Sequence, residues 1–220
     1  AAMQVLTVSN QATSSVFSEA LNAAFSGSTG DAGHNGGGIS NLIAGGSNAA
    51  AMVVSLNTGT AGAKLGSVTL GYQTDGTGPN GNSGLVATSA GAQTIQVSGN
   101  VYTQAIAQVV PATVNFGIVH VGDVVAQQAV AVTNTAAVTS LNDTLTGSIG
   151  GATGPFSASG NLGTGVAAGQ TDSSSLKVGL ATTTAGVFSS GSASVTLKSH
   201  NADMADADLG TSTVNLLAQV

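Results

Sequence analysis

The chain has 220 residues, of which only 5% are charged, with nine acidic side chains against three lysines and a net charge of −6. This balance argues against nucleic acid as a partner, because phosphates require clusters of Lys and Arg. The chain has no cysteine, which excludes disulfides and thiolate metal sites, and no apolar run as long as a membrane span. The hydrophobic fraction of 42% is too high for a disordered chain and predicts a folded core.

Segments of the first half of the chain recur in the second half, in the same order and at a nearly constant offset. Repetition at this scale indicates an array of similar modules. We therefore predict two tandem domains, 1–104 and 105–220, each large enough for its own core. The matching segments are Val8–Asn10 with Val132–Asn134, Leu21–Asn22 with Leu141–Asn142, Val68–Leu70 with Val195–Leu197, and Thr94–Val97 with Thr213–Leu216.

Short apolar runs that alternate with small polar residues predict β-strands in the first half. In the segment 16–25, Phe17, Leu21 and Phe25 are spaced as on a helix, but its counterpart in the second half favours a strand. The glycine-rich segments 27–46 and 75–84 are predicted loops, and Lys64 is placed in a turn. The other predicted strands contain Val5–Val8, Ala51–Leu56, Val68–Leu70 and Ile95–Val97.

The second half begins near the segment 104–111, because Pro111 suits the edge or the start of a strand. The alternation around Lys177 directs that side chain to solvent and its neighbours inward. Frequent short strands separated by turn residues predict an all-β fold of two tandem immunoglobulin-like β-sandwich domains. The predicted strands of this half contain Ala112–Asp123, Leu141–Ile149, Leu176–Leu180, Val195–Leu197 and Val214–Leu216.

The first copy lacks a counterpart of the opening strand, Ala112–Asp123, because it begins inside the next strand. A sandwich without that strand exposes unpaired backbone groups and part of its core. Three explanations stay open. A segment upstream supplies the strand, the domain tolerates its absence, or a strand from another subunit fills the gap, as in donor-strand complementation.

Two stretches resemble a known bacterial family. Val114–Asp123 and Val130–Thr135 at the start of the second copy, and Gln73–Gly78 followed by Asn82–Leu85 in the first, resemble "choice-of-anchor D" repeats. Those repeats are similar to the immunoglobulin-like ASH and hydin domains. The second copy departs from the loop pattern at Ser199–Asp208. The resemblance implies immunoglobulin-like sandwiches in large exported surface proteins, and it implies no activity, ligand or site residue.

The densest group of carboxylates is formed by Asp203, Asp206 and Asp208, close to Asn201. Calcium takes six to eight oxygen ligands, which a loop can supply from carboxylates and carbonyls. The spacing differs from that of an EF-hand, so the alternatives are a loose calcium site and a solvated acidic loop. These three aspartates are the one metal-site candidate, and calcium is the one cofactor candidate.

The remaining motifs do not predict a reaction. Gly76–Gly81 has the letters of a dinucleotide-binding loop, but a strand and not a helix follows it. His34, His120 and His200 fall in separate elements, so no hydrolytic triad is indicated. Lysine crosslinks of the isopeptide type need a buried lysine beside a carboxylate, and none of the lysines is expected to be buried. We therefore predict that the protein is not an enzyme.

These observations predict a structural or adhesive segment of an exported bacterial protein, such as a stalk, a filament or a surface-layer module. The expected partners are neighbouring repeats, identical subunits or a surface glycan, and the expected location is extracellular or the bacterial cell surface. One alternative is a carbohydrate-binding module that uses Tyr72 or Tyr102 as its aromatic platform. Another is a fibre subunit joined to its neighbours by donated strands.

Overall fold

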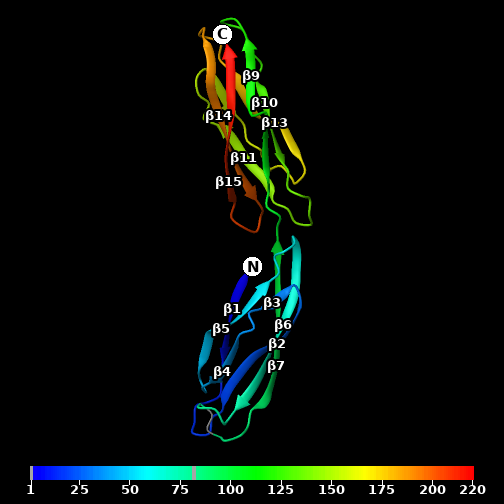
Figure 1. Cartoon of the computed structure of the whole chain (residues 1–220), viewed down its shortest axis with the longest axis vertical. Helices are drawn as coiled ribbons and strands as arrows, with labels where there is room; N and C mark the ends of the chain where they lie inside the picture. Colours follow the sequence, from blue (N-terminus) through cyan, green and yellow to red (C-terminus); the bar gives the residue numbers. More distant parts are fainter. Residues whose placement is uncertain (1, 81–82) are drawn as a thin grey trace. The chain divides into compact units, whose positions relative to one another are not determined.

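A computed structural model describes residues 2–80 and 83–220, so Gly81 and Asn82 of the predicted loop lie outside the described residues. Among the described residues every regular element is a strand, which confirms the all-β fold class. The contacts divide the chain into two compact units, Ala1–Val101 (unit 1) and Tyr102–Val220 (unit 2). Figure 1 labels strands of both units where there is room.

The described residues of unit 1 form two sheets. One has the strand order β1-β5-β3 and the other has the order β4-β2-β6-β7, with antiparallel pairing throughout. The strands are β1 (Met3–Ser9), β2 (Ala20–Gly30), β3 (Ala32–His34), β4 (Gly38–Leu42), β5 (Ser47–Leu56), β6 (Gly62–Asp75) and β7 (Thr88–Val101).

Unit 2 also contains two sheets, with the orders β12-β13-β10-β8 and β11-β14-β15-β9. Its pairing is antiparallel except between β9 and β15, which run parallel and lie side by side in Figure 1. The strands are β8 (Ala107–Val110), β9 (Thr113–Ile118), β10 (Gln128–Asn134), β11 (Thr144–Gly150), β12 (Phe156–Ser159), β13 (Thr171–Leu180), β14 (Val187–His200) and β15 (Ala207–Gln219).

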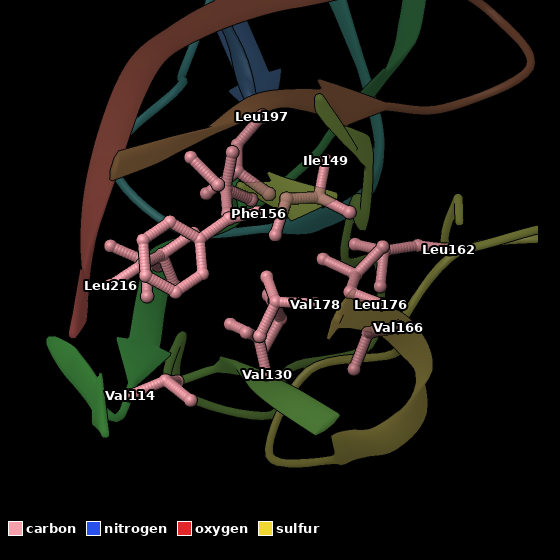
Figure 2. Close-up of a cluster of buried hydrophobic side chains, with 14 of the residues drawn as sticks. Val114, Val130, Ile149, Phe156, Leu162, Val166, Leu176, Val178, Leu197 and Leu216 are labelled. Atoms are coloured by element: carbon pink, nitrogen blue, oxygen red, sulfur yellow. The ribbon is translucent and has the colours of Figure 1, made fainter. Parts of the chain in front are cut away.

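The two sheets of each unit enclose an apolar core, as in a β-sandwich. In unit 2, Val130 and Val178 of one sheet meet Leu197 and Leu216 of the other, and all four are buried (Figure 2). Burying one such side chain contributes about 1.5–3 kcal/mol. Unit 1 has a smaller core, built around Met52 and Leu70. Alternation along each strand therefore supplies the core, as the sequence predicts.

The two units pair their strands in the same register. Leu6 of β1 faces Met52, as Val130 of β10 faces Leu176. One step further along, both ladders shift at a β-bulge, which places Val8 opposite Asn48 in unit 1. The counterparts of these two residues in unit 2, Val132 and Asp172, face each other after the same shift.

A side-chain oxygen stabilises each bulge. Asn48 Oδ1 accepts from the backbone N–H groups of Ala50 and Ala51 at 3.0 Å. Asp172 Oδ1 accepts from Ser174 N at 3.0 Å and Ser175 N at 2.8 Å. Asn and Asp favour such local hydrogen bonds to the backbone, which explains why either residue serves at this position.

The sequence matches between the two halves agree with the strand pairing at some strands and disagree with it at others. Ile95 faces Val68, as Val214 faces Ala193, so the match of Thr94–Val97 with Thr213–Leu216 agrees with the pairing. The same pairing makes Ala193 the counterpart of Val68, so the match of Val68–Leu70 with Val195–Leu197 was wrong by two residues. Leu21, however, faces Thr74 as Leu145 faces Ser199. Leu21 is therefore the counterpart of Leu145. Its match with Leu141 was wrong by four residues.

Two local predictions also need correction. The strand expected over 16–25 begins at Ala20, and Val16 and Phe17 lie exposed in a turn. The segment 27–46 is not one long loop, because it contains the end of β2 and the short strands β3 and β4. His34 of β3 stacks on Phe25 with ring centroids 4.3 Å apart. Pairing with neighbouring strands overrides the local preference of glycine for turns.

Candidate functional site

The outer edges of β1 and β7 have no strand partner among the described residues of unit 1. Strand β1 pairs with β5 alone, and β7 pairs with β6 alone. In unit 2 the corresponding strands, β10 and β15, pair on this side with β8 and β9. Among the described residues, unit 1 has no strand at the places of β8 and β9. We call these two unpaired strand edges, together with the two hollows described next, the open seam.

The β1 side of the open seam is a hollow of about 440 Å³. Thr7, Val8, Ser9 and Asn10 of this hollow are the counterparts of Ala131–Asn134. In unit 2 those four residues pair with β8, from Val110 to Ala107. The hollow therefore lies where β8 would lie if unit 1 had one.

The β7 side of the open seam is a second hollow, of about 560 Å³. Its lining includes Gln96, Val97, Ser98 and Asn100. The counterparts of these residues in β15 pair with β9, with Leu216 opposite Val114. This second hollow therefore corresponds to the place of β9.

Burial of the core differs between the units beside the open seam. In unit 2, Val130, Val214 and Leu216 are fully buried at 0% exposure. Their counterparts in unit 1 are Leu6, Ile95 and Val97, and all of them are only partly buried. The difference arises because Val114 and Phe116 of β9, 2% and 8% exposed, cover this side of the core in unit 2.

A buried polar network ties the opening segment of unit 2 to its core strands. Asn134 donates through Nδ2 to the carbonyls of Asp143 and Val166, at 3.3 and 3.1 Å. Its Oδ1 accepts from the backbone N–H of Ile106 at 3.1 Å and of Ala136 at 3.2 Å. The network satisfies every polar group of the Asn134 side chain, which is fully buried.

The same asparagine position in unit 1 is occupied by Asn10. Its Nδ2 donates to the carbonyls of Glu19 and Leu42, at 3.1 and 3.0 Å. Its Oδ1 accepts from Ala12 N at 3.1 Å, as Asn134 accepts from Ala136. Among the described residues no counterpart of Ile106 donates to Asn10, because the segment that carries Ile106 has no equivalent there.

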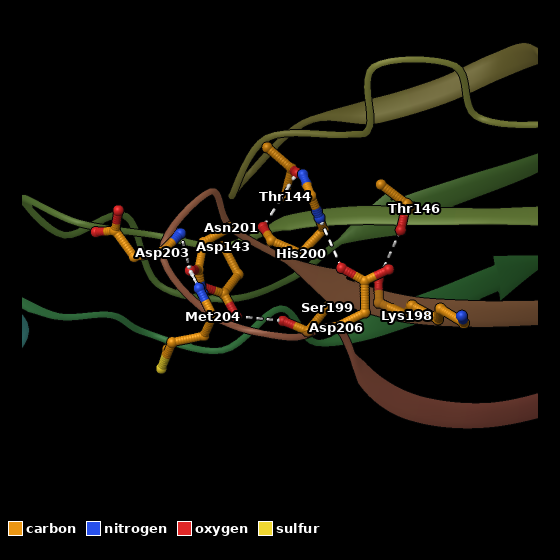
Figure 3. A network of polar contacts seen from close by, with 10 residues as sticks. All are labelled: Asp143, Thr144, Thr146, Lys198, Ser199, His200, Asn201, Asp203, Met204 and Asp206. Carbon is orange, nitrogen blue, oxygen red and sulfur yellow. Dashed lines mark hydrogen bonds and ion pairs between the residues drawn. The ribbon is translucent and has the colours of Figure 1, made fainter. Parts of the chain in front are cut away.

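In both units, one of the residues whose backbone carbonyl accepts from this asparagine also carries a side-chain carboxylate. Asp143 accepts from Ser199 Oγ at 2.7 Å and from Asn201 Nδ2 at 2.8 Å (Figure 3). Glu19, its counterpart in unit 1, accepts from Ser83 Oγ at 2.8 Å. The hydrogen bonds from Ser83 and then Thr74 hold the pKa of Glu19 below its usual value.

Two of the calcium candidates, Asp203 and Asp206, lie in the turn between β14 and β15, and Asp208 lies at the start of β15. Asp206 is 2.7 Å from His200 Nδ1, and Asp203 accepts from the hydroxyl of Tyr102 at 2.5 Å. Asp208 accepts from Gly210 N at 2.8 Å. Each carboxylate thus has a protein partner of its own, and within residues 2–80 and 83–220 no three His, Asp or Glu side chains form a metal-binding group. The calcium site stays a prediction from the sequence.

The predicted position of Lys64 in a turn was wrong. It belongs to β6 and not to a turn, and it is buried on the inner face of that strand. Its Nζ donates to Thr60 Oγ1 at 2.8 Å and lies 3.5 Å from Asp31 Oδ1. Small residues around Lys64 suggest a turn, but pairing with β7 continues the strand through them. Lys177 and Lys198 are exposed, as predicted.

A shallow hollow of about 720 Å³ lies on the sheet that contains β2 and β6, and Tyr72 lines it. The hydroxyl of Tyr72 donates to Gln93 Oε1 at 2.8 Å, and partial burial raises the pKa of Tyr72. Tyr72 is therefore a partly buried aromatic that packs against the core of unit 1. The other candidate platform, Tyr102, is held by its hydrogen bond to Asp203.

Within the part of the chain that the structure describes, no helix is long and apolar enough to cross a membrane. No protein-family model matches the chain, and no curated protein is similar enough to count as a relative.

Proposed function

We propose that the chain is a non-enzymatic structural segment of an exported bacterial protein, in which repeated sandwiches act as spacers in a stalk, filament or surface layer. The observation that carries the proposal is the repetition of one sandwich with the same strand register and the same bulge, at Val8 and at Val132. Repeats of this kind extend a chain by adding modules, each with a core of its own.

The outer faces of the sheets support this function. Hydroxyl groups pair across neighbouring strands, as between Thr29 and Ser67 and between Thr133 and Thr171, each at 2.8 Å. Cross-strand hydroxyl pairs stabilise a sheet without charge. A spacer built in this way keeps its cohesion in surroundings whose salt content varies.

The extracellular or cell-surface location is part of the proposal and rests on composition and on the resemblance to choice-of-anchor D repeats. The partners that fit are neighbouring repeats, identical subunits and surface glycans. An adhesive role is included, because sheet faces of Thr, Ser and Asn offer hydrogen bonds to such partners.

Single-molecule force spectroscopy tests the spacer function. The chain, held between reference domains, is expected to unfold in two separate events, each releasing about 30–40 nm of chain. Leu176→Ala removes a fully buried side chain of unit 2, so it is expected to lower the force of one event only. A single event for the whole chain, or events near the force noise, would contradict the spacer function.

A glycan-binding module is the second candidate, and the hollow beside Tyr72 favours it. Aromatic side chains next to polar groups are common in small-molecule sites. Glycan-array binding that is lost in Tyr72→Ala and kept in Tyr102→Ala would support this function. No binding on the array by the unmodified chain would remove it.

A further inference from the structure

We propose that Asn35 and Gly36 form a self-modifying site, at which the folded chain converts Asn35 into aspartate and isoaspartate through a cyclic imide. The site lies directly after β3 and beside β5. The fold brings together a backbone nucleophile, a base and two hydrogen-bond donors for the carbonyl that is attacked. The reaction consumes water and no other reactant, and it is independent of the spacer function.

The nucleophile is the backbone nitrogen of Gly36, and His34 is placed to take its proton. Gly36 N donates to His34 Nδ1 at 3.1 Å. Because a backbone N–H only donates, this hydrogen bond requires a lone pair on Nδ1, which is the form of the imidazole that accepts a proton. The ring of His34 is held by its stack on Phe25, with the two planes 16° apart. His34 therefore meets the geometric requirement for a general base.

The electrophile is the side-chain carbonyl carbon of Asn35. Its oxygen, Oδ1, accepts from two backbone N–H groups, Val53 N at 3.1 Å and Gly37 N at 3.0 Å. Two such donors stabilise the negative charge that develops on a carbonyl oxygen when a nucleophile adds to its carbon. The nitrogen of the same amide, Nδ2, donates to Ala51 O at 3.0 Å. The amide is therefore held at both of its polar atoms, in the residue directly before the nucleophile.

Two glycines leave room for this arrangement. A Cβ at residue 37 would overlap the carbonyl oxygen of Ala51 and crowd both polar atoms of the Asn35 amide, so only glycine lets the amide lie there. Gly36 has a φ of 69°, which favours glycine, and it has open space on the side where a Cβ would lie. The imide ring therefore closes on an unhindered nitrogen.

The reaction takes up one water and releases one ammonia. Gly36 N forms a bond to Cγ of Asn35, and its proton passes to His34 Nδ1. The bond between Cγ and Nδ2 then breaks, and that proton leaves with Nδ2 as ammonia, which completes the imide ring. Asn35 is exposed, so water reaches the ring and opens it. Addition of water at Cγ gives aspartate, and addition at the backbone carbonyl of residue 35 gives isoaspartate, in which the main chain runs through Cγ.

The products loosen the end of β3. Asn35 continues the pairing of β3 with β5, because its backbone N–H donates to Val53 O at 3.0 Å and its side chain bonds β5 as well. Aspartate has no N–H for Ala51 O and brings a negative charge against that carbonyl. Isoaspartate lengthens the main chain by one carbon, which disturbs the register that begins where His34 faces Val54. Among the described residues β3 pairs with β5 alone, so no second strand compensates.

The test compares the full chain in its native state with the same chain unfolded in guanidinium chloride, at one pH and one temperature. Tandem mass spectrometry follows deamidation at Asn35 and at Asn80, which precedes the other Asn-Gly bond of the sequence. In the unfolded chain the two asparagines are expected to react at similar rates, because only the local sequence acts there. In the native chain Asn35 is expected to react about tenfold or more faster than in the unfolded chain. A native rate at or below the unfolded rate would overturn the proposal.

Two substitutions of His34 separate a chemical role from a structural one. His34→Phe keeps a ring for the stack on Phe25 and removes the base, whereas His34→Gln keeps an acceptor for Gly36 N and removes the basic nitrogen. Both variants are expected to lower the native rate at Asn35 about tenfold or more and to leave the unfolded rate unchanged. Native rates equal to that of the parent, in variants whose circular dichroism matches the parent, would overturn the assignment of the base.

Amide exchange measures the effect of the products on β3. In chain that has deamidated at Asn35, amides at 32–35 and 51–54 are expected to exchange about tenfold or more faster than in fresh chain, with unit 2 unchanged. Asn35→Gln is the matched control, because its longer side chain has to close a larger ring and is expected to stay intact over the same incubation. Equal loosening of these amides in the control would overturn the link between the imide and β3.

Discussion

Asn10 and Asn134 perform the same structural task in the two units, each joining two backbone carbonyls through one side-chain amide. The two residues differ in what reaches their oxygen. Asn134 accepts from Ile106 in addition to Ala136 and is fully buried, whereas Asn10 accepts from Ala12 and is 8% exposed. Asn10 Oδ1 lacks the second donor because, among the described residues, unit 1 has no segment equivalent to the one that carries Ile106.

Substitution of these asparagines by alanine is expected to affect the units unequally. Asn134→Ala leaves buried carbonyl and N–H groups without partners and should destabilise unit 2 by about 3 kcal/mol. Asn10→Ala should destabilise unit 1 by about 1–2 kcal/mol, because water reaches the open seam and replaces part of the lost bonding. Amide exchange measured on peptides from each unit separates the two effects. An equal or larger loss in unit 1 would contradict this account of the seam.

Phe116 is expected to be the main apolar contribution of β9. It is 8% exposed, and its ring centroid lies 5.9 Å from that of Phe156. Phe116→Ala should lower the free energy of unfolding of unit 2 by about 3 kcal/mol. Ile118→Ala is the matched control on the same strand, since Ile118 is 79% exposed, and its effect should stay within about 0.5 kcal/mol. Urea denaturation of both variants decides the point.

Acid is expected to weaken the bulge of unit 2 through Asp172. Hydrogen bonds from Ser175, first through its hydroxyl and then through its N–H, hold the pKa of Asp172 below the ordinary value of 3.8. The stabilisation is therefore complete above that value and is lost as the pH falls through the lower pKa of the folded state.

Asp172→Asn provides the test, because Asn48 already holds the equivalent bulge in unit 1 with an amide. At pH 7 the variant should match the parent within about 0.5 kcal/mol. Below pH ~4 unit 2 of the variant should keep more of its stability than unit 2 of the parent. Acid unfolding followed by exchange in unit 2 measures this, and identical acid profiles would speak against the carboxylate.

Salt is expected to matter little to stability. Hydroxyl pairs such as Thr133 with Thr171 carry no charge, and the His120–Asp123 and His200–Asp206 pairs lie at the surface. Raising NaCl from about 0.05 to 0.5 M should shift the melting temperature by less than about 2 °C. Calorimetry at several salt concentrations measures the shift. A rise of many degrees would mean that repulsion among the acidic groups governs stability.

The sequence predicts the all-β fold class, because the alternation of apolar and polar residues along each strand is a local pattern. It misplaces Leu21 because Leu-Asn and similar pairs of residues recur by chance in a chain rich in few residue types. The correct counterpart, Leu145, is set by pairing with distant strands. The burial of Lys64 could not be predicted from nearby residues either, because pairing with β7 extends the strand that contains Lys64.

The open seam could be expected only in outline. The missing strand pointed to an exposed edge, but the two hollows and the acceptor on Asn10 depend on how two sheets approach each other. The acidic turn at Asp203, Asp206 and Asp208 looked like one site because its residues are close in sequence. Their side chains form hydrogen bonds with separate partners, because spacing in the sequence does not determine side-chain direction.

The positions of the lysines have a consequence for resistance to proteolysis. Proteases that cleave after basic residues need an extended, accessible segment around a lysine or arginine, and the chain has no arginine. Lys64 is buried, and Lys177 and Lys198 lie within β13 and β14, each paired with neighbouring strands on both sides. Trypsin-like enzymes can therefore cleave the chain only after a sandwich unfolds. The rate of digestion is then set by unfolding.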